Sequence, residues 1–209
     1  MSSVKKSSAK PRSPRSAKQG RLVLNRREAL LEVAADLFGS QGYEGTSIRD
    51  IASTVGMLPG SVYYHFKSKG DLLLEVHRQG VRHFHKELAA SLETAGNDPW
   101  ERFQAAATAH LTTLLDDSRY AQIVTPEFTR SVPKEMRAEM ISERDSYEIH
   151  FSELIDNLPL ENLTDRRIFR LALFGALNWS VNWYSEGKLS PREIANLICQ
   201  MFRNSKQSN

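Results

Sequence analysis

The sequence predicts an all-α fold, and two observations support this class. From residue 26 onward, apolar residues recur at the three- and four-residue spacing of amphipathic helices. No segment shows the sustained alternation of β-branched and polar residues, bounded by hairpin turns, that strands require. The chain has 209 residues, 40% of them hydrophobic, which is enough to bury a substantial core. We therefore expect nine helices, arranged as a small domain joined to a larger one.

Capping motifs define the first two helices. The first is expected to begin after Asn25, a residue type that caps helix N-termini, and to end at the glycines of residues 39–42. The second begins with a capping box, in which the side chains of Ser47 and Asp50 satisfy each other's backbone N–H groups. It ends at Gly56, so it has barely two turns.

A third and a fourth helix follow directly. Proline suits the first turn of a helix, and Pro59 starts a short helix that reaches Tyr64. Ser68 and Asp71 form another capping box, which opens a longer helix to about Leu92. This longer helix connects the N-terminal third of the chain to the rest.

Prolines and capping residues divide the remaining chain into five further helices. Thr164 is the expected cap of the fourth of these, and a capping box with proline at the first helical position opens the last. The five helices are expected over residues 99–116, 119–130, 134–157, 164–184 and 191–203.

The charge of the chain is unevenly distributed. Residues 1–27 contain nine of the 28 basic residues and none of the 25 acidic ones, so the remainder carries a net charge of −6. A basic arm on an acidic body indicates a polyanionic partner at that end of the molecule. Segments rich in Ser, Lys, Arg and Pro also occur as disordered, solubilising leaders, and both interpretations stay open. We expect residues 1–24 to be a disordered basic arm.

Several classes of protein are disfavoured by the sequence. It has no apolar run long enough to span a bilayer and no secretory signal, so we expect a cytoplasmic protein. Cys199 is the one cysteine and lies in an apolar helical pattern typical of a buried thiol. No motif of a nucleophilic hydrolase or a phosphate-binding loop occurs. His77, His83 and His85 come nearest to a metal cluster, but His83 and His85 diverge on a helix. We expect no metal, no cofactor and no enzymatic activity.

The stretch from Thr46 to Lys69 contains two short helices and the tight turn between them. The apolar residues expected to bury one side of a compact wedge are Ile48, Ile51, Ala52, Val55, Val62 and Phe66. The second helix is then free to enter the major groove of DNA. Gly60 and Ser61 are small enough to let the backbone approach phosphates and base edges. The outward hydrogen-bonding side chains are Tyr63, Tyr64 and His65, flanked by the Thr46 hydroxyl and the Lys69 ammonium group.

Together with residues 38–43 before it and residues 72–73 after it, this stretch resembles the DNA-binding domain of the tetracycline-repressor (TetR) family. The family pattern ends in Tyr-x-His-Phe-x-Ser-Lys, which this chain matches over residues 63–69. The resemblance covers residues 26–74 and implies a helix-turn-helix DNA-binding domain over residues 25–70, with the recognition helix over residues 58–65. The candidate DNA-contacting residues are Thr46, Leu58, Pro59, Gly60, Ser61, Tyr63, Tyr64, His65 and Lys69.

Three of these residues have alternative roles. Many members of the family have Ser or Thr where this chain has Leu58, so Leu58 cannot supply a capping hydroxyl and would instead contact a thymine methyl group. Tyr63 could serve mainly in packing, and His65 could serve only to order the turn.

The resemblance also implies a ligand-binding and dimerisation domain over residues 71–205. A single wedge reads only a few base pairs, so such modules bind DNA as two-fold dimers. The family pairs its last two helices with their copies, whereas the alternative is a core formed within one chain. The candidate dimerisation residues are Phe174, Leu177, Val181, Tyr184, Ile194, Leu197, Ile198 and Met201.

The middle helices are expected to enclose a pocket for a small effector. The region from Asn178 to Pro191 resembles TetR regulators that respond to acyl-coenzyme A thioesters, and Arg119, Arg130 or Arg144 would then meet the phosphates. The candidate ligand-binding residues are Phe103, Tyr120, Phe128, Arg144, Tyr147, Phe174 and Asn178. Aromatic residues at helical spacing are also common in cores, and Asn178 and Asn182 could instead pair across a dimer interface.

The function that these features favour is a ligand-responsive transcriptional repressor. It would bind a palindromic operator as a homodimer, and a small effector, such as an acyl-coenzyme A, would release it. An activator or an architectural DNA-binding protein without a ligand is the alternative. A collapsed C-terminal core would favour the architectural protein.

Overall fold

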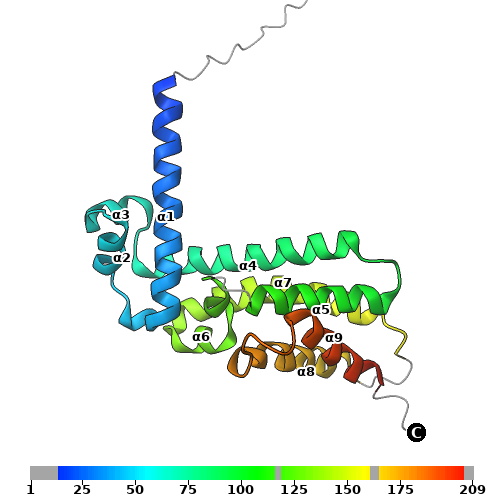
Figure 1. The fold of residues 1–209 in the computed structure, drawn as a ribbon. Coiled ribbons are helices and arrows are strands. Elements are labelled where there is room, and N and C mark those ends of the chain that lie inside the picture. Colours follow the sequence, from blue (N-terminus) through cyan, green and yellow to red (C-terminus); the bar gives the residue numbers. More distant parts are fainter. Residues whose placement is uncertain (1–13, 116–118, 161–164, 205–209) are drawn as a thin grey trace, which may run out of the picture.

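A computed structural model describes residues 14–115, 119–160 and 165–204, with side chains from residue 26 onward. Every regular element in these ranges is helical, which confirms the predicted all-α class (Figure 1). The α-helices are α1 (Pro14–Gly45), α2 (Ile48–Val55), α3 (Pro59–His65), α4 (Lys69–Thr94), α5 (Pro99–Leu115), α6 (Pro126–Ser131), α7 (Lys134–Asp156), α8 (Arg166–Trp179) and α9 (Pro191–Asn204). Two 3₁₀ turns, η1 (Ala121–Val124) and η2 (Ser180–Asn182), complete the list.

The local signals at α2 are confirmed. Ser47 is the N-cap, with its hydroxyl 3.2 Å from the backbone nitrogen of Asp50, and the Asp50 carboxylate accepts from the Ser47 backbone N–H at 3.1 Å. Gly56 ends the helix in the left-handed conformation, with φ of 70°, which a residue without a Cβ adopts freely. The turn between α2 and α3 is therefore fixed by residues that are close in sequence.

Helix α1 begins earlier than expected. It starts at Pro14 and not after Asn25, so residues 14–24 are helical and not disordered, while residues 1–13 of the predicted arm lie outside the described chain. Pro14 suits the first helical turn, and the residues after it are mostly strong helix formers. The other end agrees with the expectation, because Gly42 breaks the helical geometry with φ of 74°.

Two hydrophobic cores share helix α4. The N-terminal core joins α1–α3 to the first half of α4 and also receives residues from η1, α6 and the start of α7. The C-terminal core joins the second half of α4 to α5, α7, α8 and α9. Helix α4 supplies Leu72, Leu73 and Val76 to the first core and Val81, Phe84 and Leu88 to the second. In Figure 1, α4 runs from the end that carries α2 and α3 along the C-terminal helices.

The C-terminal helices differ from the expectation in two places. The predicted helix over residues 119–130 is divided into η1 and α6, because Pro126 can only begin a helix. Asp165 caps α8, while the expected cap Thr164 lies outside the described residues. Helix α8 ends at Trp179 and not at Tyr184. The Ser180 hydroxyl donates to the Ala176 carbonyl at 3.2 Å, and such side-chain bonds compete with regular helical pairing.

The capping box expected at the start of α9 is confirmed. The Glu193 carboxylate accepts from the backbone N–H of Ser190 at 2.8 Å, and the Ser190 hydroxyl accepts from the backbone N–H of Glu193 at 3.3 Å. Across the described ranges, none of the helices combines the length and apolarity that crossing a bilayer requires.

Candidate nucleic-acid interface and ligand cavity

Helix α3 presents large side chains to solvent at one end of the molecule. Val62 is buried in the N-terminal core, whereas Tyr63 is 54% exposed and Tyr64 81% exposed. Leu58, the N-cap of α3, is 76% exposed and makes no capping side-chain hydrogen bond. Exposed aromatic and aliphatic side chains on one short helix are typical of a binding surface. The predicted division of this helix into a buried and an outward side is present in the structure.

The space around Gly60 supports the same interpretation. No described atom outside its immediate neighbours lies within 4 Å of the position that a Cβ at Gly60 would take, and its φ is not positive. Neither the packing of the described chain nor the backbone conformation therefore requires glycine there. A partner that approaches the backbone at the start of α3 would require it.

Thr46 and Lys69 hold the helices of this region together. Thr46 is buried, and its hydroxyl oxygen lies 3.0 and 2.8 Å from the carbonyl oxygens of Leu37 and Gly42. Lys69 Nζ donates to the carbonyl oxygens of Tyr43 and Thr46 at 2.9 and 3.1 Å, and it lies 4.0 Å from the Tyr43 ring centre. Both residues therefore fasten the end of α1 to the starts of α2 and α4. Their predicted phosphate contacts stay predictions.

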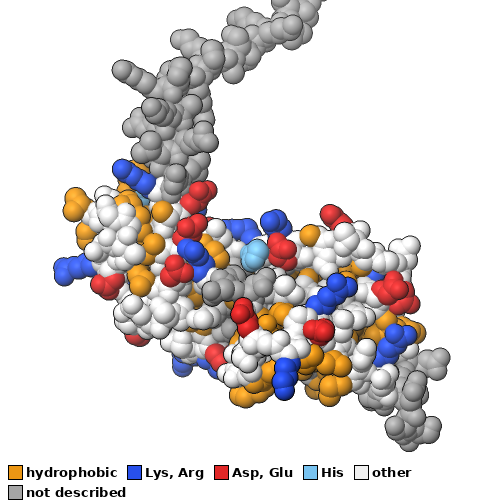
Figure 2. Space-filling view, viewed as in Figure 1, with side chains coloured by type: hydrophobic (Ala, Val, Ile, Leu, Met, Phe, Trp, Pro, Cys, Tyr) orange, Lys and Arg blue, Asp and Glu red, His pale blue; other side chains and the backbone are white. Residues whose placement is uncertain are grey.

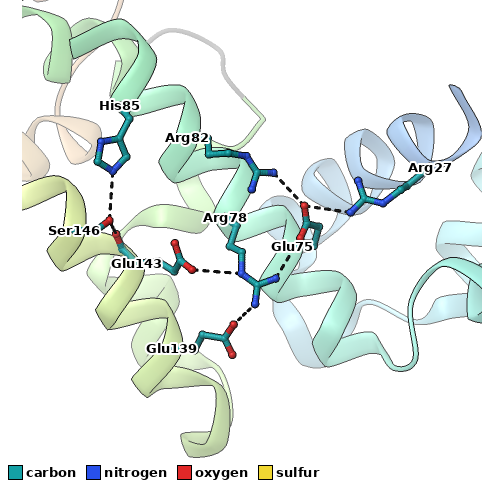
Figure 3. Close-up of polar contacts among 8 residues, drawn as sticks. All are labelled: Arg27, Glu75, Arg78, Arg82, His85, Glu139, Glu143 and Ser146. Carbon is teal, nitrogen blue, oxygen red and sulfur yellow. Dashed lines mark hydrogen bonds and ion pairs between the residues drawn. The ribbon is translucent and has the colours of Figure 1, made fainter. Parts of the chain in front are cut away.

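A cluster of ion pairs connects α1 to α4 (Figure 3). The Glu75 carboxylate lies 3.2 Å from the guanidinium groups of Arg27 and Arg78 and 3.0 Å from that of Arg82. Burial alone would raise the pKa of Glu75, but the three arginines outweigh it and hold that pKa below its usual value. Glu75 is therefore ionised at neutral pH and joins the two helices.

The same cluster continues to α7. Arg78 pairs with Glu139, and its Nε lies 3.4 Å from Glu143 Oε1. About two helical turns beyond Arg78 on α4, His85 Nε2 lies 3.3 Å from the Ser146 hydroxyl (Figure 3). These contacts form a polar seam in which α4 lies between α1 and α7.

A small, partly open space, the inner cavity, adjoins the C-terminal core. Its volume is about 30 Å³. Its apolar lining residues are Val81, Phe84, Leu114, Val124, Pro126 and Phe174. Its polar lining residues are His110, Thr125, Arg144, Tyr147, Glu148 and Asn178. Because a cavity of about 30 Å³ has room for only a few water molecules at most, a ligand of the size of an acyl group has to displace side chains to enter it.

A larger hollow, the outer cleft, adjoins the inner cavity. Its volume is about 660 Å³, and it shares five lining residues with the inner cavity: Pro126, Arg144, Glu148, Phe174 and Asn178. Four arginines line it, Arg130, Arg144, Arg167 and Arg170, against the acids Glu127, Asp145 and Glu148. The two spaces therefore form one site with a narrow, largely apolar interior and a wide, charged mouth.

Glu148 lies where the two spaces meet. Its carboxylate lies 3.2 Å from Arg144 Nε, without hydrogen-bond alignment, and 3.5 Å from Arg170 Nη1. Burial raises the pKa of Glu148 in spite of these two arginines. Arg144 and Arg170 are held at the outer cleft by Glu148. Each guanidinium group has five N–H donors, and those not directed at Glu148 suit the binding of a phosphate.

His110 connects two other lining residues. Its Nδ1 lies 3.1 Å from the Tyr147 hydroxyl, and its Nε2 lies 3.0 Å from Asn178 Oδ1. Burial lowers the pKa of His110 to about 4, so the ring is neutral at physiological pH. His110 was not among the residues predicted from the sequence, although a histidine within an apolar helical pattern is a signal for such a residue.

The predicted ligand-binding residues are only partly brought together. Arg144, Tyr147, Phe174 and Asn178 line the inner cavity. Phe103 packs against Trp100 and Phe169 in the C-terminal core, Phe128 belongs to the N-terminal core, and Tyr120 lies beside Gly80. These last three residues do not line either space.

The predicted dimerisation residues divide in the same way. Phe174, Leu177 and Ile194 are buried within the core of this chain, so the expectation that these three form a contact surface is corrected. Tyr184 and Ile198 are half-buried against that core, and their role in a dimer stays a prediction. Val181, Leu197 and Met201 are exposed. Other large apolar side chains exposed on α8 and after it are Ile168, Leu171, Trp179 and Trp183. Figure 2 shows hydrophobic side chains gathered over the α8 and α9 side of the molecule.

The histidines do not form a metal site in the part of the chain that the structure describes, where no three potential ligands lie close together. His77 is buried, and neither of its ring nitrogens has a hydrogen-bond partner among the described residues. Cys199 is buried as expected, and burial raises the pKa of its thiol to about 12.

Comparison with protein-family models gives two matches. A model described as "Bacterial regulatory proteins, tetR family" matches residues 30–76, which contain α2, α3 and the start of α4. A model described as "Tetracyclin repressor-like, C-terminal domain" matches residues 96–205, more than half of the chain.

Individual relatives agree with these models. The chain is 36% identical over 100 residues to the HTH-type transcriptional repressor KstR2 of Mycolicibacterium smegmatis, a match covering 48% of this chain and 47% of that protein. The chain thus spans about half the length of the curated relatives it matches.

Two solved structures resemble the whole fold. The crystal structure of AibR in complex with isovaleryl coenzyme A and operator DNA is similar with a TM-score of 0.73 and 25% identity, over 84% of this chain and 97% of AibR. The crystal structure of the superantigen PfiT is similar with a TM-score of 0.72 and 32% identity, over 84% of this chain and 95% of PfiT.

Proposed function

Because the chain belongs to the TetR family of bacterial regulatory proteins, we propose that it is a transcriptional repressor that binds a palindromic operator as a homodimer and is released by an acyl-coenzyme A. Members of this family are DNA-binding transcription factors, so the expectation of a regulator and not an enzyme agrees with the family. The observation that carries the DNA-binding part is the outward face of α3, with Tyr63 and Tyr64 exposed beside the open space at Gly60.

The proposed interface uses a helix with few basic residues. Most phosphate contacts then come from a segment outside α3. Residues 1–27, which contain nine basic residues, adjoin the helix-turn-helix in sequence and can supply these contacts. Aromatic and small residues at the start of α3 contact base edges and backbone, while the basic segment supplies charge.

The proposed effector matches the two-part ligand site. A narrow apolar interior suits an acyl group, and a wide mouth lined by four arginines suits the phosphates of coenzyme A. The similar protein AibR was crystallised with isovaleryl coenzyme A and operator DNA, which supports this class of ligand.

The proposed release mechanism follows from the size of the inner cavity. An acyl group enters only if residues such as Phe84 and Phe174 move apart, and Phe84 lies on α4. The same helix packs the N-terminal core through Leu72 and Leu73. A ligand that favours a displaced α4 therefore favours a different position of α3 and lowers the affinity for the operator.

The proposed dimer uses the exposed apolar side chains of α8 and α9. A double substitution of Leu197 and Met201 by aspartate should convert a dimer to a monomer in light scattering, because it places charge in an apolar interface. Ile149→Asp changes an exposed apolar residue of α7 and serves as the control. A wild-type protein that is monomeric at micromolar concentration would contradict the dimer.

The experiment on DNA binding uses the full chain. The wild-type protein first selects genomic DNA fragments. Fluorescence anisotropy then measures the affinity of the wild type, Tyr64→Ala and the control Ile149→Ala for these fragments. We expect Tyr64→Ala to lose about fivefold or more in affinity with an unchanged melting temperature, since loss of one good base contact costs about 1–3 kcal/mol. Equal affinity of Tyr64→Ala and the wild type would contradict α3 as the interface.

The effector and the sign of regulation are tested separately. Isovaleryl coenzyme A and longer acyl-coenzyme A thioesters are titrated into the protein–DNA complex, and release supports the effector class. If no thioester changes the DNA affinity, that class is wrong and the DNA-binding proposal stands. A reporter that becomes active when the gene is deleted indicates a repressor, whereas loss of expression indicates an activator.

A further inference from the structure

The three polar residues His110, Tyr147 and Asn178 form a hydrogen-bonded chain with a fixed direction. An amide oxygen can only accept, so the contact of 3.0 Å between His110 Nε2 and Asn178 Oδ1 requires a proton on Nε2. The neutral ring then has an unprotonated Nδ1, which accepts from the Tyr147 hydroxyl at 3.1 Å. Each of the three residues comes from a different helix, α5, α7 or α8.

This chain determines which way the Asn178 amide points. With its oxygen held by His110, the amide nitrogen of Asn178 is directed away from the histidine. Among the described residues, no group accepts a hydrogen bond from that nitrogen. Asn178 lines both the inner cavity and the outer cleft, so its two free N–H donors lie at the passage between them.

Packing alone does not account for this arrangement. Buried polar groups lower stability unless they are hydrogen-bonded, and an apolar side chain at each position would fill the same core. His110 lies within 6.0 Å, between ring centres, of the apolar rings Phe84, Phe151 and Phe174. Three polar residues thus lie in an aromatic core, and the two N–H groups of the Asn178 amide are oriented at the entrance to the inner cavity.

We propose that the Asn178 amide nitrogen donates a hydrogen bond to an uncharged carbonyl oxygen of the effector, and that His110 is the positioning residue that orients this amide. The proposal rests on the proposed acyl-coenzyme A effector. A thioester meets the geometry, because its carbonyl separates an apolar acyl group from a polyanionic portion. The acyl group then occupies an expanded inner cavity, and the phosphates lie among the arginines of the outer cleft.

The electrostatic surroundings favour a neutral acceptor. The low pKa of His110 keeps the ring uncharged, so the direction of the hydrogen-bond chain persists above about pH 5. Glu148 and Arg144 also line the passage and are paired with each other, so neither contributes an isolated charge there.

The test compares two ligands that differ only at the carbonyl. Isovaleryl-coenzyme A has the thioester, and isopentyl-coenzyme A is its thioether, in which a methylene replaces the carbonyl. Calorimetric titration of the full-length wild type should show about tenfold tighter binding of the thioester, the value of one hydrogen bond of roughly 1.4 kcal/mol. Asn178→Leu should bind the thioester as weakly as the thioether and should leave thioether binding within about twofold of the wild type.

Two variants of His110 distinguish its role in orienting the Asn178 amide from its role in filling space in the core. His110→Gln can still donate to Asn178 and accept from Tyr147, so it should keep most of the thioester preference. His110→Phe fills the site without hydrogen bonds and should lose that preference. Thermal melts of each variant establish that it is folded, and the wild-type comparison of the two ligands needs no variant.

The outcomes distinguish this inference from the proposed function. If the wild type binds both ligands equally, the carbonyl contact is wrong while the coenzyme A effector stands. Equal loss of both ligands in Asn178→Leu would likewise contradict it. If the wild type binds neither these ligands nor any longer acyl-coenzyme A, the effector class and this inference are both wrong.

Discussion

Arg27 of α1 and Glu75 of α4 form an ion pair of 3.2 Å, and the same carboxylate also binds two arginines of α4. We predict that Glu75→Gln lowers the free energy of unfolding by about 1–2 kcal/mol, because Arg27 and Arg82 lose their carboxylate partner in a partly buried setting and Arg78 loses one of three. The measurement is urea denaturation at low ionic strength.

A matched control exists on the same helix. Glu87→Gln removes contacts with His83 and Lys86 that are largely exposed, so it should change the free energy by less than about 0.5 kcal/mol. If both variants behave alike, the cluster around Glu75 contributes nothing specific.

The features of this region that could be predicted are those that depend on neighbours in sequence. The Ser47–Asp50 capping box, the glycine ends at Gly42 and Gly56 and the outward position of Tyr64 all follow from residues a few positions apart. A contact between Lys69 and DNA phosphate was predicted from the family pattern. The hydrogen bonds of Lys69 to Tyr43 and Thr46 could not be inferred, because the contact with Tyr43 joins positions 26 residues apart.

The ligand site was predictable only in part for the same reason. The second half of the helix predicted over residues 164–184 is apolar on nearly every side, so its pattern does not indicate which face meets the core of its own chain. Phe174 and Leu177 were therefore wrongly assigned to a dimer surface. The contact between His110 and Asn178 joins residues 68 positions apart. Only the packing of α5 against α8 brings them together.

His77 should make the stability of the protein depend on pH. Burial, with help from the charges of Arg144 and Arg78, lowers the pKa of His77 to about 4, whereas an unfolded histidine titrates near 6.5. The unfolded chain therefore binds more protons between these values. Stability is unaffected above about pH 6.5 and falls by roughly 3 kcal/mol as the pH drops toward 4.

The variant His77→Leu removes this dependence. It should be more stable than the wild type at pH 7 by about 1 kcal/mol or more, because it eliminates two buried nitrogens without partners in the described structure. Part of the decline at low pH should persist, since His110 has a similar pKa. His83→Leu, at a half-exposed histidine of the same helix, is the control, and an equal pH profile for His77→Leu and the wild type would refute the assignment.

Gly80 lies where α4 packs closely against Val124 of η1 and the neighbouring Tyr120. A Cβ at this position would lie 2.8 Å from Val124 Cγ1 and 3.2 Å from Tyr120 Cβ. We predict that Gly80→Ala lowers the free energy of unfolding by about 1–3 kcal/mol through overpacking. Gly175→Ala is the control, because open space surrounds that position and the substitution should stabilise α8 by about 0.5 kcal/mol.

The clash at Gly80 also identifies its partner. Val124 lines the inner cavity, and its Cγ1 is the atom nearest to the added Cβ. Adding Val124→Ala to Gly80→Ala removes this methyl group and should restore most of the lost stability. The coupling energy of this double-mutant cycle should be about 1 kcal/mol or more. Strict additivity of the two substitutions would show that the strain lies elsewhere.

The basic N-terminal segment should contribute to DNA binding through charge. Each phosphate contact adds about 0.9 to the slope of the logarithm of the binding constant against the logarithm of salt concentration. We predict that deleting residues 1–20 weakens binding to selected DNA and flattens this slope. Because α1 begins at Pro14, the deletion also shortens a helix, so replacing Lys5, Lys6, Lys10 and Arg12 with glutamine is the cleaner variant. A salt slope that stays at the wild-type value in both variants would exclude the segment from the interface and leave the phosphate contacts to the helix-turn-helix.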